Sequence, residues 1–218
     1  MSEFASKPMA FLSDIHGQLA PLDAVLDAVR SQEITDIFVA GDILLGGDQP
    51  LAVWRRLQEV GARCVRGLSD SALALFDISK APKAETEEMK ERLERFERTR
   101  QDIGELALER LRRLPERLRI PLQDGREIVM VHGSPADPTI EMSHDLSDDE
   151  LLALIADDPA DIVICGSTHV PFRRDVEQIS VVNIGSVGAS LEPNIAHYTI
   201  VTPRLSGAQI QQLWVKYE

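Results

Sequence analysis

Histidines, aspartates and serines follow five short apolar runs of this sequence, and a glycine stands within two residues of each group. Asp14 and His16 stand in FLSDIHG, Asp42 in IFVAGD, Ser69 and Asp70 in CVRGLSD, His132 in IVMVHGSP, and Ser167 and His169 in IVICGSTH. Imidazole nitrogens and carboxylate oxygens are the ligand set of Mn, Fe, Zn or Ni rather than of a cysteine-rich structural zinc site. Glycine lets the backbone turn sharply and come close to a ligand. The sequence therefore predicts a divalent transition-metal site.

The five apolar runs have the length and composition of buried strands, and they can bring these groups together. In α/β sheets the loops at the carboxyl ends of the strands meet in one crevice, where ligands bind. Asp14 and His16 are two residues apart, so on an extended stretch they are expected to point to the same side and hold one ion together.

The segments between the runs predict helices. Apolar residues recur at helical spacing in residues 19–29 and 50–60, and 146–156 forms a third candidate with Ser147 as its N-cap. Residues 118–133 predict a β-hairpin that turns at Asp124 and Gly125. This alternation predicts an α/β fold with a mixed sheet, or with two sheets packed together.

Composition limits the function classes. A chain of 218 residues is expected to form a single domain, residues 1–218, and its net charge of −13 disfavours binding to nucleic-acid phosphates.

Cys64 and Cys165 lie in apolar runs, which predicts buried free thiols. We see no signal peptide and no apolar segment of about 20 residues, so we expect a cytoplasmic protein that does not bind membranes.

Residues 84–114 differ from the rest of the chain because they are rich in Glu and Arg. Apolar side chains at helical spacing predict one or two helices packed by one face, within a helical insert at approximately 80–117. The stripe consists of Met89, Leu93, Phe96, Ile103, Leu106 and Leu114. A solvated amphipathic insert is the ordinary interpretation. A lid over the site, or a contact within a homo-oligomer, is the alternative.

The series D-x-H, G-D, G-x-x-D, V-H-G and G-x-x-H resembles the calcineurin-like metallophosphoesterase superfamily through nearly the whole chain. HGSPADP, THVPF and VVNIGSVG resemble its small bacterial branch of phosphodiesterases and phosphatases that act on small substrates. The resemblance implies a four-layer α/β/β/α sandwich with a two-metal site at the strand ends. It also implies metal-dependent hydrolysis of a phosphate ester in a small phosphorylated substrate.

The resemblance assigns one ion a complete set of ligands. These are Asp14, His16, Asp42 and His169. A second ion would share Asp42 and bind His132. At the other two positions, Leu68 replaces the asparagine of the family and Ser167 replaces a histidine. We therefore expect one firmly bound ion, a second that is weak or absent, and either slow hydrolysis or a catalytically inactive protein that binds a metal or a phosphorylated ligand.

Further residues are candidates for catalysis or substrate binding. Asp70 could orient water or donate a proton, but capping of a following helix is equally compatible with its position, and Ser69 replaces the general-acid histidine of the family. Arg66 could bind a substrate phosphate, although a surface ion pair is the more ordinary interpretation. His132 and Ser167 are expected to help hold the phosphate. Residues 183–186 match a block of the family that forms a tight turn near the site.

Overall fold

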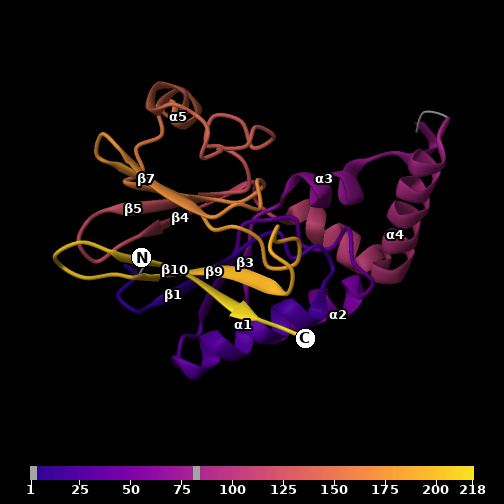
Figure 1. The fold of residues 1–218 in the computed structure, drawn as a ribbon, viewed down its shortest axis with the longest axis horizontal. Coiled ribbons are helices and arrows are strands. Elements are labelled where there is room, and N and C mark those ends of the chain that lie inside the picture. The colour runs from indigo at the N-terminus through magenta and orange to yellow at the C-terminus, as the bar shows by residue number, and fades with distance from the viewer. Residues whose placement is uncertain (1–3, 81–83) are drawn as a thin grey trace.

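The computed structural model describes residues 4–80 and 84–218, and in it the chain forms two five-stranded sheets packed face to face. Helices cover the outer face of each sheet, so the order of layers is helix, sheet, sheet, helix (Figure 1). This arrangement confirms the predicted α/β sandwich of two mixed sheets.

The first sheet has the strand order β10-β9-β1-β2-β3. Its strands are β1 (Met9–Leu12), β2 (Asp36–Val39), β3 (Arg63–Cys64), β9 (Ile195–Thr202) and β10 (Gln209–Lys216). β1, β2 and β3 are parallel, whereas β9 and β10 are antiparallel to their neighbours. The carboxyl ends of the three parallel strands therefore lie at one edge of the sheet, where the loops that follow them can form a shared site.

The second sheet has the order β4-β5-β6-β8-β7. Its strands are β4 (Arg117–Pro121), β5 (Glu127–Val131), β6 (Ile162–Cys165), β7 (Phe172–Val176) and β8 (Ile179–Asn183). β5, β6 and β8 are parallel. β4 and β5 form the predicted hairpin, and Gly125 in its turn has φ 88.

Five α-helices and one short 3-10 helix connect the strands in the described residues. They are α1 (Leu19–Ser31), α2 (Pro50–Glu59), α3 (Leu68–Leu75), η1 (Ile78–Lys80), α4 (Glu87–Arg113) and α5 (Asp148–Ile155). The Ser147 side chain accepts a hydrogen bond from the Glu150 amide and caps α5 as expected. None of these helices has the length and apolar character needed to cross a membrane.

Alternation along the strands produces separate cores. Met9 and Phe11 of β1 face the second sheet, whereas Ala10 and Leu12 face the helices, because successive side chains of a strand point to opposite faces. A third core lies between the second sheet and α5. Phe11 stacks on Phe38 at a ring-centroid distance of 4.9 Å in the core between the sheets. The two sheets are thus held in a fixed relation, which fixes the relation of the loops at their strand ends.

Helix α4 packs against α2 and α3, but the predicted apolar stripe is wrong at two positions. Met89 is 40% exposed and Leu106 is 70% exposed. Gly104 interrupts the helical backbone inside α4 with φ 72 and ψ 170. The helical phase therefore shifts after Gly104, and residues 107, 108 and 111 are buried in the second half of α4 instead. Residues 81–83 of the predicted insert lie outside the described residues.

Candidate metal centre

The predicted site residues lie in loops that directly follow parallel strands, and their backbone is unusual. Nine described residues other than glycine have a positive φ, and five of these belong to the predicted site. They are Asp14, His16, Asp42, Ser167 and His169, with φ between 50 and 73. Left-handed backbone costs a non-glycine residue about 1–2 kcal/mol, and such strain concentrates at functional sites. The strained loops are therefore an independent indication of a functional site, separate from residue type.

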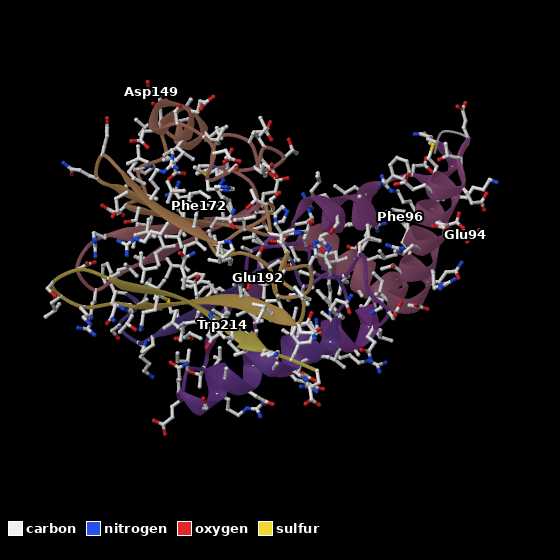
Figure 2. The ribbon with its side chains drawn as sticks, in the orientation of Figure 1. Glu94, Phe96, Asp149, Phe172, Glu192 and Trp214 are labelled. Carbon is white, nitrogen blue, oxygen red and sulfur yellow. The ribbon has the colours of Figure 1, made fainter. Side chains whose placement is uncertain are left out.

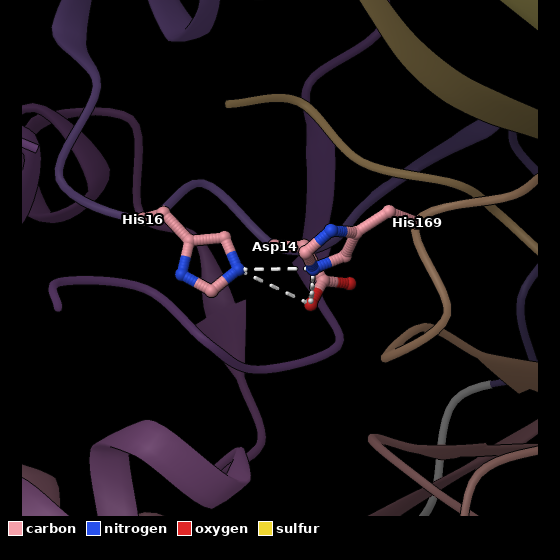
Figure 3. A group of neighbouring side chains, drawn as sticks. All are labelled: Asp14, His16 and His169. Atoms are coloured by element: carbon pink, nitrogen blue, oxygen red, sulfur yellow. Dashed lines mark hydrogen bonds and ion pairs between the residues drawn. The ribbon is translucent and has the colours of Figure 1, made fainter. Parts of the chain in front are cut away.

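Three donor side chains converge in what we call the His16 cluster, which consists of Asp14, His16 and His169 (Figure 3). Nε2 of His16 and Nε2 of His169 lie 3.1 Å apart. Asp14 Oδ1 lies 3.7 Å from the first nitrogen and 3.3 Å from the second. The sequence predicted an extended stretch for Asp14 and His16, and this prediction is wrong because both residues have a positive φ. Left-handed turns at both residues bring their side chains together.

Hydrogen bonds to backbone groups fix the orientation of His16 and Asp14 in this cluster. His16 Nδ1 donates to the Leu45 carbonyl oxygen at 2.9 Å, and Asp14 Oδ2 accepts from the Ser167 amide at 3.0 Å. Asp14 Oδ1 is buried and has no hydrogen-bond partner among the described residues. Metal-ligating histidines usually donate their other ring nitrogen to a carbonyl or carboxylate, which directs the free nitrogen toward the ion.

A second group, the His132 cluster, contains Asp42, His132 and again Asp14. His132 Nε2 lies 3.4 Å from Asp42 Oδ1 and has no hydrogen bond among the described residues. His132 Nδ1 donates to the Ala40 carbonyl oxygen at 2.8 Å, which repeats the arrangement at His16. Asp14 therefore belongs to both clusters, whereas the resemblance gave the shared position to Asp42. The placement of Asp42 with the first ion stays a prediction.

The charges of the two clusters are strongly coupled. Burial would raise the pKa of Asp14, but the imidazoles of His16 and His169 outweigh burial and hold the pKa well below its usual range. Burial would lower the pKa of His132, but the Asp42 carboxylate raises it to about 9. The Asp42 carboxylate thus faces a His132 imidazole that carries a proton at pH 7, and a divalent cation would take the place of this proton.

The loop of Gly67, Leu68, Ser69 and Asp70 lies against Asp42. The Ser69 amide donates to Asp42 Oδ1 at 2.9 Å, and a Cβ on Gly67 would collide with the Asp42 carboxylate. Asp70 is fully buried, and its two oxygens accept from the amides of Ile43 and Gly67 at 3.0 Å. Both hydrogen bonds give Asp70 a structural role at the start of α3. The catalytic roles of Asp70 and Ser69 stay predictions; the Ser69 hydroxyl is buried and has no hydrogen-bond partner in the part of the chain that the structure describes.

The predicted substrate-binding residues differ in their surroundings. Ser167 meets Asp14 through its backbone amide and lies beside the His16 cluster. Arg66 donates to the Arg112 carbonyl oxygen at 2.9 Å and pairs with Glu116 at 3.0 Å. The guanidinium of Arg66 is therefore engaged by the end of α4 and the following loop, and its role in phosphate binding stays a prediction.

Two further residues hold the loops of the site, and residue type alone gave no reason to place them there. The Asn183 side chain donates to the Gly166 carbonyl oxygen at 2.7 Å and to Thr168 Oγ1 at 2.9 Å. The Ser186 hydroxyl donates to the Asp14 carbonyl oxygen at 2.7 Å. The segment VVNIGSVG was the available signal, but it predicted a turn and not these two hydrogen bonds.

The residues present fit a divalent metal ion. Two orphaned buried polar atoms, Asp14 Oδ1 and His132 Nε2, point into groups of donors that lie within 4.8 Å of one another. Buried polar atoms without partners are rare and require an explanation such as an ion. The nitrogen and oxygen donors suit Mn, Fe, Zn or Ni.

Comparison with known proteins agrees with this geometry. The family model described as the calcineurin-like phosphoesterase superfamily domain matches residues 8–204. A comparison with curated proteins found no match.

Solved structures share the fold. A hypothetical protein from Pyrococcus horikoshii superimposes with a TM-score of 0.80 at 23% identity, over 97% of this chain and 88% of the other. A metallophosphoesterase from Sphaerobacter thermophilus gives 0.73 at 22% identity, over 98% and 90% of the two chains. A phosphoesterase from E. coli gives 0.53 at 20% identity, over 97% and 100%.

Proposed function

Because this chain belongs to the calcineurin-like phosphoesterase superfamily, we propose that it hydrolyses phosphate esters of a small substrate with one firmly bound divalent transition metal. Both phosphodiesters and phosphomonoesters are candidate substrates. The observation that carries the proposal is the convergence of Asp14 Oδ1 with the Nε2 atoms of His16 and His169, in a family whose members use metals.

The His16 cluster would hold the ion, with manganese, iron, zinc or nickel as candidates. A divalent ion acts as a Lewis acid and lowers the pKa of water from 15.7 to about 7. The protein contributes fixed ligands, since Leu45 and Ser167 orient His16 and Asp14 before any ion arrives. Such fixed ligands need little reorganisation when the substrate binds.

The His132 cluster would hold the phosphate or a weakly bound second ion. His132 supplies a nitrogen donor and Asp42 an oxygen donor, but Leu68 and Ser167 stand where the family has an asparagine and a histidine. Loss of one ion from a two-metal site could raise the barrier by about 3 kcal/mol, roughly a hundredfold in rate. We therefore propose a slow enzyme, or one with narrow specificity.

The same two substitutions support a second candidate function. Leu68 has no donor atom, and a neutral serine hydroxyl is a poor substitute for imidazole as a ligand. A family member with these residues could bind a metal ion or a phosphorylated ligand in a regulatory or structural role without cleaving it. A cytoplasmic location and a homo-oligomeric state fit either function and are part of the proposal.

Metal analysis combined with hydrolysis of p-nitrophenyl phosphate and bis-p-nitrophenyl phosphate, with Mn²⁺ or Ni²⁺ added, tests the proposal. Turnover that is lost in Asp42→Asn and kept in Asp27→Asn, an exposed aspartate of α1, supports the enzyme. Bound metal without turnover of either ester with any added ion supports the non-hydrolytic function instead.

A further inference from the structure

The outer face of α3 carries two exposed leucines with a half-buried alanine between them. Leu68, Ala72 and Leu75 are spaced by four and three residues, which places them on one face of a helix. The opposite face buries Leu73 and Ala74. Leu68 is 53% exposed and Leu75 is 59% exposed, and we call these three residues the α3 stripe.

The stripe is continuous with further apolar surface. Phe76 follows α3 directly and is 42% exposed. Its ring contacts Phe96 of α4 edge-on, with the ring centroids 6.0 Å apart, and Phe96 is labelled in Figure 2. A single exposed leucine is ordinary, but apolar side chains gathered on successive turns of one helix indicate a binding surface.

The stripe begins at the candidate metal centre. Leu68 lies between Gly67, which packs on Asp42, and Ser69, whose amide donates to Asp42 Oδ1 at 2.9 Å. From that point α3 extends toward α4 (Figure 1). A phosphate bound at the His132 cluster would therefore have an apolar surface beside it, leading away from the site.

The size of the stripe favours a small ligand over a protein. The stripe and Phe76 form a short apolar strip of four residues on one helix, whereas a standard protein interface spreads over about 20–30 residues on each side, with an apolar core and a polar rim. Leu68 and Leu75 are seven residues apart, about 10 Å along a helix axis, which is the scale of a short hydrocarbon chain.

We infer that the α3 stripe binds the hydrocarbon part of the substrate, so that this protein acts on phosphate esters of an apolar alcohol. The inference rests on the proposed function, since it places the phosphate beside Asp42. Leu68 is then a specificity-determining residue. It stands where the family has a metal-ligating asparagine, and it provides an apolar contact next to the phosphate instead.

Binding of n-octylphosphonate and methylphosphonate to the manganese-loaded protein, measured by calorimetry, tests the inference because neither compound is hydrolysed. We expect the octyl compound to bind about tenfold more tightly. Leu75→Ser should reduce this preference about fivefold and leave methylphosphonate binding unchanged. Leu205→Ser, at an 81% exposed leucine between β9 and β10, is the matched control and should leave both affinities unchanged.

The results separate the inference from the proposed function. Equal binding of the two phosphonates overturns the inference, even if aryl phosphates are hydrolysed. A preference that Leu205→Ser weakens as much as Leu75→Ser also overturns it, because the binding is then nonspecific. If sedimentation shows a wild-type dimer and a Leu75→Ser monomer, the stripe is a contact between copies of the chain and the inference is wrong. An octyl preference that depends on Leu75 supports it, including in a protein without turnover, in which case only the proposed hydrolysis fails.

Discussion

The His16 cluster and the His132 cluster use the same kinds of donor, but they differ in completeness and in access. The side chains of His16 and His169 are 17% and 27% exposed, whereas that of His132 is 2% exposed. The first cluster brings two imidazole nitrogens to one carboxylate oxygen. The second offers one imidazole, and the neighbouring loop ends in the exposed leucine of the α3 stripe.

The loops beside the two clusters share one feature despite this difference. The loops after β3 and β6 still pack against Asp42 and Asp14 through backbone amides. Since backbone amides make these contacts, the contacts do not depend on the side chain of Leu68.

The largest effect is expected from Asp14, because it belongs to both clusters. Asp14→Asn removes one carboxylate charge from each, and we expect bound metal to fall to background and aryl phosphate turnover to fall by about a thousandfold, or 4 kcal/mol. Elemental analysis and a p-nitrophenol assay measure both quantities, with Asp27→Asn as the control. Retention of a full equivalent of metal would contradict the role of Asp14 as a metal ligand.

Restoring the missing donors should make the two clusters more alike. The double change Leu68→Asn with Ser167→His is expected to raise metal content from about one to about two ions per chain, and turnover up to about a hundredfold. Each single change should have a much smaller effect, because a single added donor leaves the second site incomplete. An unchanged metal content in the folded double variant contradicts this prediction.

Asp14 and Asp70, in the loops beside the two clusters, should contribute to the free energy of unfolding with opposite dependence on pH. The pKa of Asp14 is lowered in the folded state, so its contribution to the free energy of unfolding is lost as pH falls. Burial, followed by the nearby Asp42 charge, raises the pKa of Asp70 from 3.8 to about 6, so its contribution is full below pH 3.8 and is lost as pH rises through 6. Relative to Asp70→Asn, the wild type should therefore lose about 2 kcal/mol of unfolding free energy between pH 4 and pH 6.5, measured by urea unfolding. A difference between the two proteins that stays constant over this range would contradict the raised pKa of Asp70.

The smallest effect concerns the reactivity of the two thiols. Both are free and buried, which confirms the sequence prediction. Cys64 ends β3 before the loop of Leu68, and Cys165 ends β6 before the loop of His169. Burial raises the pKa of Cys64 to about 12 and that of Cys165 further. We expect both to react with Ellman's reagent at pH 8 at least about a hundredfold more slowly than in urea, because the reactive thiolate is rare in the folded state.

The order of labelling compares the two loops directly. Cys64 is 9% exposed and Cys165 is fully buried, so Cys64 should react first. Cys64→Ser and Cys165→Ser assign the two phases. Faster labelling of Cys165 would show that the loop beside the His16 cluster opens more readily than the loop of Leu68.

Much of the fold was predictable because local patterns agree with it. The runs at β1, β2 and β6 have short apolar sequences, α2 has Pro50 at its start and Gly61 after its end, and Ser147 caps α5. The phase of α4 was not predictable, because the apolar spacing does not indicate that Gly104 leaves the helical conformation. Packing of the two halves of α4 against the body decides that conformation.

The candidate site divides in the same way. Residue type and position after a strand identified Asp14, His16, Asp42, His132 and His169. The carbonyl oxygens of Leu45 and Ala40, which orient two of these histidines, could not be identified, because every residue has a carbonyl group and only the folded loops show which one is used. The same holds for the side chain of Asn183, which holds the loop of Thr168.

The sequence by itself determined which donor atoms exist and that each follows a strand, because residue type and short apolar runs are local properties of the chain. Only the tertiary structure decided which donors meet. His16 and His169 are separated by 153 positions, and their nitrogens come within 3.1 Å because the packing of two sheets fixes the relation of their loops. The left-handed backbone that aims Asp14 at both clusters is likewise imposed by the surrounding hydrogen bonds, since an isolated chain disfavours it.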